Sequence, residues 1–362
     1  MTRGREIALA LVATVVALVG VEIVLRVVTP DERTCFEHDP LLGWTHKLYC
    51  VGRLRREEFD TVVRTNGQRM RESEDFGPHA GRYRVAVIGD SFVWGHGIDE
   101  EDRFTELLAA RLGPAYEVLN FGVAGFGTDQ YLLQIERDVL PMQPDLLLVV
   151  FFVNDLEDIM AATNHRGVPK PRFALRDGRP ELTGVPVPRI AGWDDPPRAR
   201  ARTRIGQLFA ALWPARPSQF YNPAHIALLR RDKAEVLEQA LALNALLFER
   251  IADLARAARV TLVLTEVPFK EQFASDDALR ASFGVVREEL LLDRPAQSLA
   301  ETGRRLGVHH LDTYPYIEGH GGLDNYYVGD QHLNRRGHAA MAAVLDAALR
   351  EARRSRAGPG RS

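Results

Sequence analysis

Five short apolar segments alternate with amphipathic helical segments, and this alternation constrains the fold more than any other feature. The apolar segments cover residues 84–89, 116–122, 145–153, 260–267 and 308–312. Apolar residues at helical spacing predict helices over 101–112, 128–139, 232–258 and 295–306, with a last helix capped by Asn334. Repeated strand–helix–strand crossovers require a parallel sheet with helices on both faces. The chain is therefore predicted to adopt an α/β fold with five parallel strands.

The most apolar of these segments, 145–153, indicates a strand that is buried on both faces. The five strands suit the flavodoxin-like order 2-1-3-4-5, in which a site forms beside the carboxyl ends of the strands. The long helix over 232–258 is expected to turn Val236, Leu243 and Leu247 towards the sheet. Functional residues are therefore sought in the segments that follow each strand.

The chain begins with an uncharged apolar run, residues 7–21, that follows two arginines. Continued to Val28, the run is about 22 residues long, which is enough to cross a bilayer as a helix. A cleaved signal peptide and a buried helix are the alternatives. The run is long for a signal peptide, and no small-x-small cleavage site follows it. We expect residues 1–30 to form an uncleaved anchor that spans the membrane through residues 7–28, with the remaining chain extracytoplasmic or periplasmic.

Cys35 and Cys50 are the only cysteines of the chain. In an oxidising compartment they could form a disulfide, and closing a loop of this length would be worth about 3 kcal/mol. Two unpaired thiols are the alternative. Both residues belong to a polar segment, 31–83, in which turn signals surround the strand-like "FDTVVRT". This segment is predicted to be an N-terminal extension that carries a hairpin.

The main domain is predicted over 84–352, with an unusual connection at 164–230. This connection holds many prolines and the basic stretch "PPRARARTR", and it is too long for a plain link between a strand and a helix. We expect a functional insertion such as a lid, and a poorly ordered loop is the alternative. Residues 353–362 show no apolar pattern and are predicted to be disordered. The net charge of −3 argues against nucleic acid as a partner.

The first strand ends in Gly-Asp-Ser, which places Ser91 at the edge of the sheet where the strands end. A serine there becomes a nucleophile only when a base accepts its proton. His332, in "VGDQHLNRRGH" before the last helix, is the candidate base, and Asp330 two residues earlier could orient its ring. Each of these motifs taken alone is also explained by ordinary turn chemistry.

Acyl transfer also needs hydrogen-bond donors that face the developing oxyanion. The second strand is followed by "NFGVAGFG", in which one of Gly122, Gly125 and Gly127 could point its N–H into the site. The third strand is followed by Asn154 and Asp155, and the Asn154 amide could supply a second donor. Motifs of this kind at successive strand ends together indicate an acyl-transfer site.

At these residues the sequence resembles the SGNH, or GDSL-type, hydrolase family. The resemblance covers about 84–155 and 327–350, and the matching residues are Gly89-Asp90-Ser91, Gly125, Asn154-Asp155 and His332. It implies that Ser91 is the nucleophile, that His332 is the general base and that Asp330 orients His332. It further implies an oxyanion hole formed by the N–H groups of Ser91 and Gly125 and the side chain of Asn154. The family acts on O-acyl esters without a metal or an organic cofactor.

Two positions depart from the family pattern. The acid usually lies three residues before the histidine, where this chain has Gly329, whereas Asp330 lies two residues before it. Asp324 is the alternative acid. The glycine usually found two residues before the asparagine is replaced by Phe152, which narrows the site or changes how Asn154 is held.

The other histidines are expected to have no part in the chemistry. His96 is interpreted as an incidental loop residue, and His338 as a packing or surface residue of the last helix. His309 and His310 lack the partners of a metal site. No G-x-S-x-G elbow surrounds Ser91, which argues against an α/β-hydrolase.

These features together predict a membrane-anchored serine esterase. We expect it to remove a small acyl group, such as acetyl, from a carbohydrate or lipid of the cell envelope. An O-acyltransferase that uses the same acyl-enzyme on Ser91 is one alternative. A non-catalytic envelope assembly or glycan-binding module is another, and it predicts that His332 lies far from Ser91.

Overall fold

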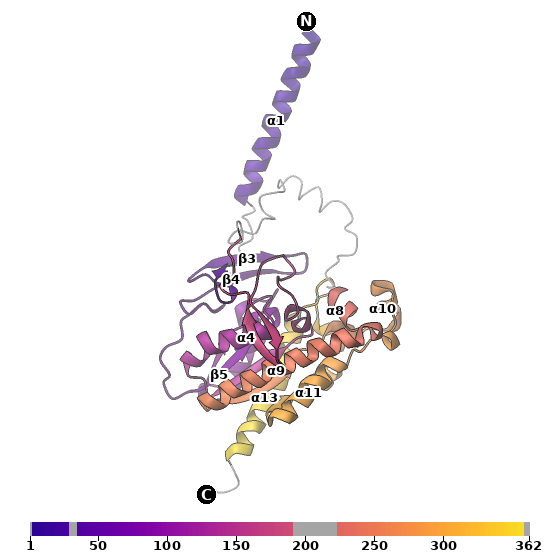
Figure 1. The fold of residues 1–362 in the computed structure, drawn as a ribbon. Coiled ribbons are helices and arrows are strands. Elements are labelled where there is room, and N and C mark those ends of the chain that lie inside the picture. Colours follow the sequence, from indigo (N-terminus) through magenta and orange to yellow (C-terminus); the bar gives the residue numbers. More distant parts are fainter. Residues whose placement is uncertain (1, 29–34, 191–222, 358–362) are drawn as a thin grey trace.

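A five-stranded parallel sheet forms the centre of the molecule (Figure 1). The computed structural model describes residues 2–28, 35–190 and 223–357. The strands of this sheet are β5 (Tyr83–Ile88), β6 (Tyr116–Asn120), β7 (Leu146–Phe151), β10 (Thr261–Glu266) and β11 (His309–Leu311). Their order is β11-β10-β7-β5-β6, which is 2-1-3-4-5 counted from the other edge. The predicted fold class and strand order are therefore confirmed.

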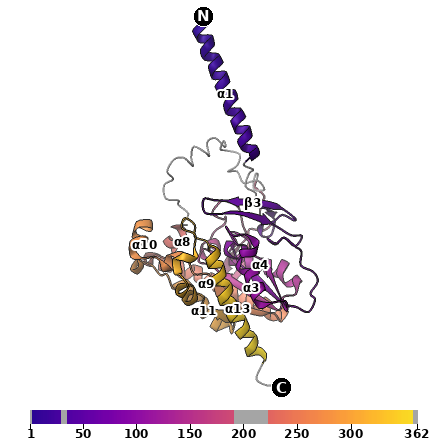
Figure 2. The same cartoon turned by 180° about the vertical axis from the view of Figure 1, so that it is seen from behind.

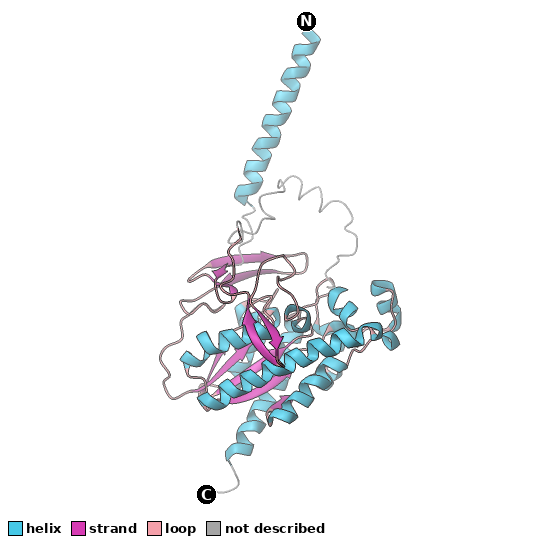
Figure 3. Ribbon diagram, viewed as in Figure 1, coloured by secondary structure: helices cyan, strands magenta, loops and turns pink. Residues whose placement is uncertain are grey.

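The middle strand explains why the sheet is parallel and doubly covered. All six residues of β7 are buried, and β7 pairs in parallel with β5 on one side and β10 on the other. A strand that is apolar on both faces needs a cover on both faces. Figure 3 shows the strands enclosed by helices.

The helices form two layers. The longer ones are α3 (Phe104–Leu112), α4 (Thr128–Gln134), α9 (Ala234–Ala258), α11 (Arg294–Leu306) and α13 (Arg335–Ala357). The long α9 packs against α4 and α11 on the face seen in Figure 1. On the opposite face, seen in Figure 2, α3 packs against α13. Shorter helices are α2 (Ser91–Trp94), α5 (Asp155–Asp158), α8 (Pro223–Leu228), α10 (Asp276–Phe283) and α12 (Tyr314–Gly319).

One prediction about α9 was wrong. Leu243 and Leu247 are buried as expected, but Val236 is 43% exposed. The neighbouring Leu237 is fully buried instead. Leu237, Leu241 and Phe248 lie within about 40° of one another around the helix axis, whereas Val236 lies about 100° from Leu237, at the edge of the buried face and in the first turn of α9.

The N-terminal extension carries two hairpins where the sequence predicted one. The first consists of β1 (Phe36–Asp39) and β2 (Gly43–His46), and the second of β3 (Val51–Arg55) and β4 (Asp60–Arg64). The second hairpin corresponds to the strand predicted in "FDTVVRT". The first was missed because its two strands have four residues each and no apolar alternation.

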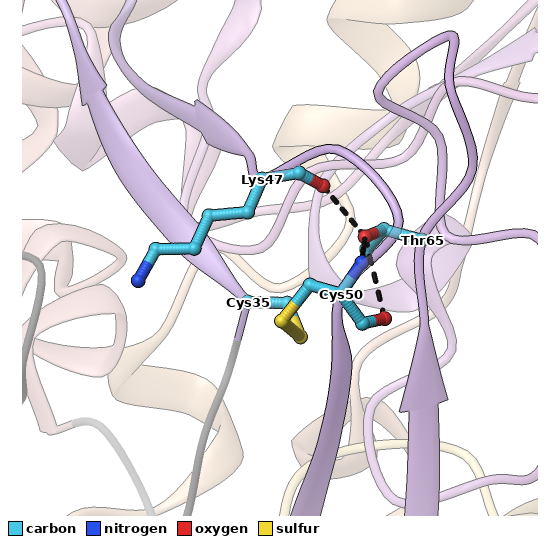
Figure 4. Close-up of a disulfide and its surroundings, with 4 residues drawn as sticks. All are labelled: Cys35, Lys47, Cys50 and Thr65. Atoms are coloured by element: carbon cyan, nitrogen blue, oxygen red, sulfur yellow. Dashed lines mark hydrogen bonds between the residues drawn. A yellow bond between two sulfur atoms is a disulfide. The ribbon is translucent and has the colours of Figure 1, made fainter.

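A disulfide between Cys35 and Cys50 ties the two hairpins together (Figure 4), which is the first of the two alternatives that the sequence left open. The two Cα atoms are 5.7 Å apart. Thr65 supports the bridge, because its hydroxyl accepts the N–H of Cys50 at 2.9 Å and donates to the carbonyl of Lys47 at 2.6 Å. The extension is therefore cross-linked at Cys35, its first described residue.

The helix α1 (Thr2–Val28) corresponds to the predicted anchor. Among the described residues it is the one helix long and apolar enough to cross a membrane. Its segment Gly4–Leu25 has a mean hydropathy of 2.7, and none of it is buried within the protein. Length and composition therefore fit a span, and they fit a signal sequence equally well.

The predicted insertion and tail are described in part. Within 164–230 the chain forms a hairpin of β8 (Arg172–Arg176) and β9 (Arg179–Thr183), and α8 lies near its end. The stretch "PPRARARTR" lies outside the described residues, so the lid stays a prediction. The tail was predicted to be disordered from residue 353, but α13 continues to Ala357. Arginine and alanine favour helices, so the charged end extends the helix without an apolar pattern.

Candidate active site

The polar motifs predicted from the sequence meet at one edge of the sheet. Strands β5, β6 and β7 are parallel neighbours, so their carboxyl ends lie side by side. Ser91 follows β5, Gly125 follows β6 and Asn154 follows β7. His332 precedes α13 and reaches the same edge, where it contacts Ser91.

The turn before Ser91 is built to present that residue. Gly89 has no room for a side chain, because a Cβ there would lie 2.4 Å from Val93 and 3.0 Å from the carbonyl of Val150. Asp90 caps the short helix α2 by accepting the N–H of Phe92 at 2.9 Å. Ser91 is thus the first residue of α2.

Ser91, His332 and Asp330 form a continuous hydrogen-bonded chain. The hydroxyl of Ser91 lies 2.7 Å from Nε2 of His332, and Nδ1 of His332 lies 2.5 Å from Oδ1 of Asp330. The same Asp330 oxygen accepts the backbone N–H of His332 at 2.9 Å. A carboxylate at Nδ1 places the ring proton there, which leaves Nε2 free to accept the proton of Ser91. The arrangement can generate a serine nucleophile.

The electrostatics of the pair keep Asp330 ionised. Burial by itself would raise the pKa of Asp330. The charge of His332 and its hydrogen bonds outweigh burial, so the pKa of this carboxyl lies well below its usual value. Asp330 therefore remains an anion that can stabilise an imidazolium on His332.

His96 lies in the site, and its interpretation as an incidental residue was wrong. Its ring stacks on that of His332 with centroids 4.1 Å apart, and its Nε2 lies 3.7 Å from Oδ2 of Asp330. Its backbone N–H donates to the carbonyl of Ser91 at 2.9 Å. Burial, together with the nearby charge of His332, lowers the pKa of His96 well below its usual value, so its ring stays neutral. A signal existed in the sequence, because a residue one turn beyond the start of a short helix stays close to that start.

Gly125 occupies a backbone conformation suited to an oxyanion donor. Its φ of +81° is in the left-handed region that favours glycine. The indole N–H of Trp44 donates to the carbonyl of Ala124 at 3.1 Å, and this carbonyl belongs to the same peptide group as the Gly125 N–H. Trp44 comes from the first hairpin of the extension and is 1% exposed. The extension thus fixes the orientation of the Gly125 N–H, which the sequence did not indicate.

Asn154 is partly buried at the start of α5. Its amide NH2 lies 3.3 Å from Oδ2 of Asp158, and its Oδ1 is buried without a hydrogen-bond partner among the described residues. Burial raises the pKa of Asp90, and a hydrogen bond from Asn154 is among the opposing influences. The amide therefore lies beside the carboxyl group that precedes Ser91.

Asp155, the second residue of the Asn-Asp motif, stabilises the turn around Asn154 and is not one of the groups placed to react. Its Oδ1 accepts the hydroxyl of Tyr131 at 2.8 Å, and its Oδ2 accepts the N–H of Phe152 at 3.3 Å. Burial and the neighbouring Asp90 raise the pKa of Asp155 well above its usual value. These bonds fix the backbone on both sides of Asn154.

His338 and His310 behave as structural residues. His338 is 1% exposed, and its Nδ1 accepts the N–H of Phe104 at 3.1 Å, in agreement with a packing role. His310 pairs with Glu266 at 2.7 Å. Within the described part of the chain, the group with metal-ligand atoms close together is His96, Asp330 and His332. The two ring nitrogens of His332 already bind Asp330 and Ser91, so this group is arranged for proton transfer.

A comparison of the sequence with models of known protein families identifies the family of this chain. The model described as the GDSL-like Lipase/Acylhydrolase family matches residues 87–340, which is more than half of the chain. The chain belongs to this family. It is a GDSL-type, or SGNH, serine hydrolase of the acylhydrolase and esterase class.

Comparison with solved structures finds similar folds at low identity. They include TesA, the aryl esterase of M. smegmatis and a carbohydrate acetylesterase family member from Sinorhizobium meliloti. Their sequence identities are 13%, 12% and 13%, and their TM-scores are 0.42, 0.40 and 0.40. Each alignment covers 74% of this chain and 98% of the other chain. No curated protein matches the sequence.

The two departures from the GDSL-type pattern have structural consequences. Asp330 contacts His332, whereas the side chain of Asp324 is 73% exposed and pairs with Arg336 at 3.4 Å. Phe152, at the position of the usual glycine, is 1% exposed and packs on Phe92 with ring centroids 4.1 Å apart. The ring of Phe92 in turn lies 4.8 Å from that of His332. The bulky Phe152 thus fills space directly behind the site.

Proposed function

We propose that this GDSL-type hydrolase is a serine esterase whose catalytic residues are Ser91, His332 and Asp330. The observation that carries the proposal is the chain of contacts from Ser91 to His332 at 2.7 Å and on to Asp330 at 2.5 Å. A non-catalytic module would have no reason to hold these three groups in line. The distances are those of a nucleophile, its base and the orienter of that base.

The reaction follows from this arrangement. The Ser91 oxygen attacks the acyl carbon of the ester while Nε2 of His332 takes the hydroxyl proton. Asp330 stabilises the imidazolium so formed. The C–O bond to the alcohol then breaks, and the imidazolium returns its proton to the departing oxygen. A water molecule repeats these steps on the acyl group of Ser91 and releases the acid.

The negative charge on the attacked carbonyl oxygen needs donors that are already in place. We assign this role to the N–H groups of Ser91 and Gly125 and to the amide of Asn154. The positive φ of Gly125 and the bond from Trp44 to the preceding carbonyl support the assignment. The turn held by Asp155 supports it for Asn154.

The substrate we propose is an O-acyl ester of a cell-envelope carbohydrate or lipid, with a small acyl group such as acetyl. The small group is supported by Phe152, which fills the space that a glycine would leave open. The envelope is supported by α1, whose apolar segment has a mean hydropathy of 2.7. The helix would anchor the enzyme with residues 31–362 outside the cytoplasm, where the disulfide of Cys35 and Cys50 is stable.

Hydrolysis of nitrophenyl esters tests the proposal. The full chain in detergent should hydrolyse the acetate faster than the octanoate, and Ser91→Ala should abolish turnover without lowering the melting temperature. Turnover that survives in Ser91→Ala would refute the assignment. An added sugar acceptor separates the alternatives, because an acyltransferase would form acylated sugar and release little acid without it.

A further inference from the structure

The segment 327–332, which carries Asp330 and His332, has no regular secondary structure. A single antiparallel bridge closes its base, and Val328 near its start is 86% exposed. An irregular segment of this kind depends on contacts from elsewhere to hold its backbone. Those contacts therefore determine how accurately Asp330 and His332 are placed.

Two oppositely charged side chains hold the backbone of this segment. From the main domain, Nζ of Lys270 donates to the carbonyl oxygens of Tyr327 and Val328 at 2.6 and 2.7 Å. From the N-terminal extension, the two carboxylate oxygens of Glu58 accept the N–H groups of Val328 and Gly329 at 2.7 and 2.8 Å. Hydrogen bonds to an ionised group are among the strong ones. Because Gly329 immediately precedes Asp330, Glu58 fixes the backbone from which Asp330 projects.

The position of Glu58 is itself fixed by local structure. It lies on the tight turn between β3 and β4, which is closed by a bond from the N–H of Arg56 to the carbonyl of Phe59 at 2.8 Å. The strand β3 begins directly after Cys50, so the disulfide to Cys35 tethers the hairpin. The whole hairpin lies outside residues 87–340, which match the family model.

The same turn reaches the catalytic histidine by a second route. The ring of Phe59 stands edge-on to that of His96 with centroids 5.3 Å apart. His96 stacks on His332 at 4.1 Å. Phe59 also contacts Tyr327, at the start of the segment, with centroids 5.2 Å apart. Adjacent residues of one turn thus support both the backbone before Asp330 and the ring of His332.

We propose that Glu58 is a positioning residue for Asp330 and His332, and that the N-terminal extension is therefore part of the active site. The inference rests on the proposed function of Ser91 and deepens it. Removing the carboxylate removes two hydrogen bonds to the backbone and lets the segment 327–332 shift. A displacement of about 1 Å at a catalytic group can cost about 100-fold in rate. Because Lys270 still holds the carbonyls, we expect a loss of about 10- to 100-fold.

The rate of labelling by a fluorophosphonate, a reagent that forms a covalent bond with activated serines, tests this role. The full chain in detergent is compared with Glu58→Ala and Glu58→Gln. Glu57→Ala is the matched control, because Glu57 is an exposed carboxylate on the same turn and forms neither bond to the segment. We expect about 10- to 100-fold slower labelling for Glu58→Ala, a smaller loss for Glu58→Gln, which keeps one acceptor oxygen, and no change for Glu57→Ala.

Two further readouts separate positioning from stability. For a positioning role, the final labelled fraction stays the same, and kcat for nitrophenyl acetate falls while KM does not change. A lower final fraction with an unchanged rate constant would show that Glu58 only supports folding, which would overturn the proposal. Equal rates for Glu58→Ala and the wild type would overturn it as well. Failure of the wild type to label would instead refute the function proposed for Ser91, on which the inference depends.

Discussion

Replacing Asp330 by asparagine removes a charge from the site while preserving the shape of the side chain. Oδ1 of Asp330 accepts from both Nδ1 and the backbone N–H of His332, at 2.5 and 2.9 Å. The amide can keep its oxygen on these donors if its NH2 takes the place of Oδ2. Oδ2 lies 3.7 Å from Nε2 of His96, and a neutral His96 can accept from that NH2. The tautomer of His332 needed for catalysis is then retained.

The expected decrease of kcat in Asp330→Asn therefore comes from the loss of the negative charge alone. Two unit charges about 4 Å apart interact by about 4 kcal/mol at an effective dielectric constant of about 20. This corresponds to about 10³ in kcat, and partial exposure to water reduces it, so we expect a loss of about 10² to 10³. Adding His96→Phe removes the acceptor for the NH2 and favours the wrong tautomer, which costs about 10⁴ in comparable sites. The double variant should therefore be at least tenfold slower than Asp330→Asn.

The assay is kcat for nitrophenyl acetate with the full chain in detergent. Asp324→Asn is the matched control, because its exposed ion pair with Arg336 is of a type worth at most about 1 kcal/mol. We expect its kcat within about twofold of the wild type. The reasoning fails if Asp324→Asn is the damaging change or if Asp330→Asn retains more than a fifth of the activity. A double variant no slower than Asp330→Asn would refute the role given to His96.

Two further predictions concern residues away from the reacting atoms. Trp44→Phe keeps an aromatic side chain but removes the N–H that holds the peptide of the proposed oxyanion donor Gly125, so kcat should fall about tenfold with KM unchanged, less than the loss of a whole donor. An unchanged kcat would show that this peptide needs no support. Burial, together with nearby arginines, lowers the pKa of His338 from 6.5 to about 3. The unfolded chain therefore takes up a proton below pH 6.5 that the folded chain does not, so this contribution to stability is present above pH 6.5 and is lost as the pH falls. His338→Gln should lower the slope of unfolding free energy against pH by about 1.4 kcal/mol per pH unit between about pH 6 and 4, measured by urea denaturation, and an equal slope in both proteins would contradict this.

The sheet was predictable because each strand is an apolar run that can be recognised from its own residues, and because parallel sheets obey strict connection rules. The apolar run of β7 identified the middle strand, and the crossovers left few possible orders. The same logic brought Ser91 and His332 together, although they are 241 residues apart and touch at 2.7 Å. The carboxyl ends of the parallel strands lie at one edge of this fold, so functional residues that follow several strands come together there.

The phase of a helix and the end of a helix were less predictable. Val236 and Leu237 are adjacent and both are apolar, so the hydrophobic pattern alone did not decide which of them faces the sheet. The end of α13 was misplaced because arginine is compatible with both a helix and a disordered tail. In both cases the pattern permitted two structures that differ little in local free energy.

The contacts of the N-terminal extension were not predictable at all. Glu58 binds Val328 across 270 residues, and Trp44 binds Ala124 across 80. A glutamate on a polar turn has the same local pattern whether it faces water or a distant loop. The stacking of His96 on His332 was missed for a related reason, since closeness to Ser91 in the sequence places His96 near the site but does not tell which ring it contacts. Such contacts depend on how two separate units pack, which short-range patterns do not encode.

The extension links the proposed anchor to the proposed site through a short piece of chain. Residues 29–34 separate the end of α1 from Cys35, and a fully extended chain of this length spans at most about 25 Å. The disulfide joins Cys35 to the hairpin that carries Glu58, and Glu58 contacts the segment before Asp330. With the end of α1 at the surface of a bilayer, Cys35 and its disulfide are held within that distance of the lipid. A substrate embedded in or attached to that surface then meets the site at a far higher local concentration than a freely diffusing ester does.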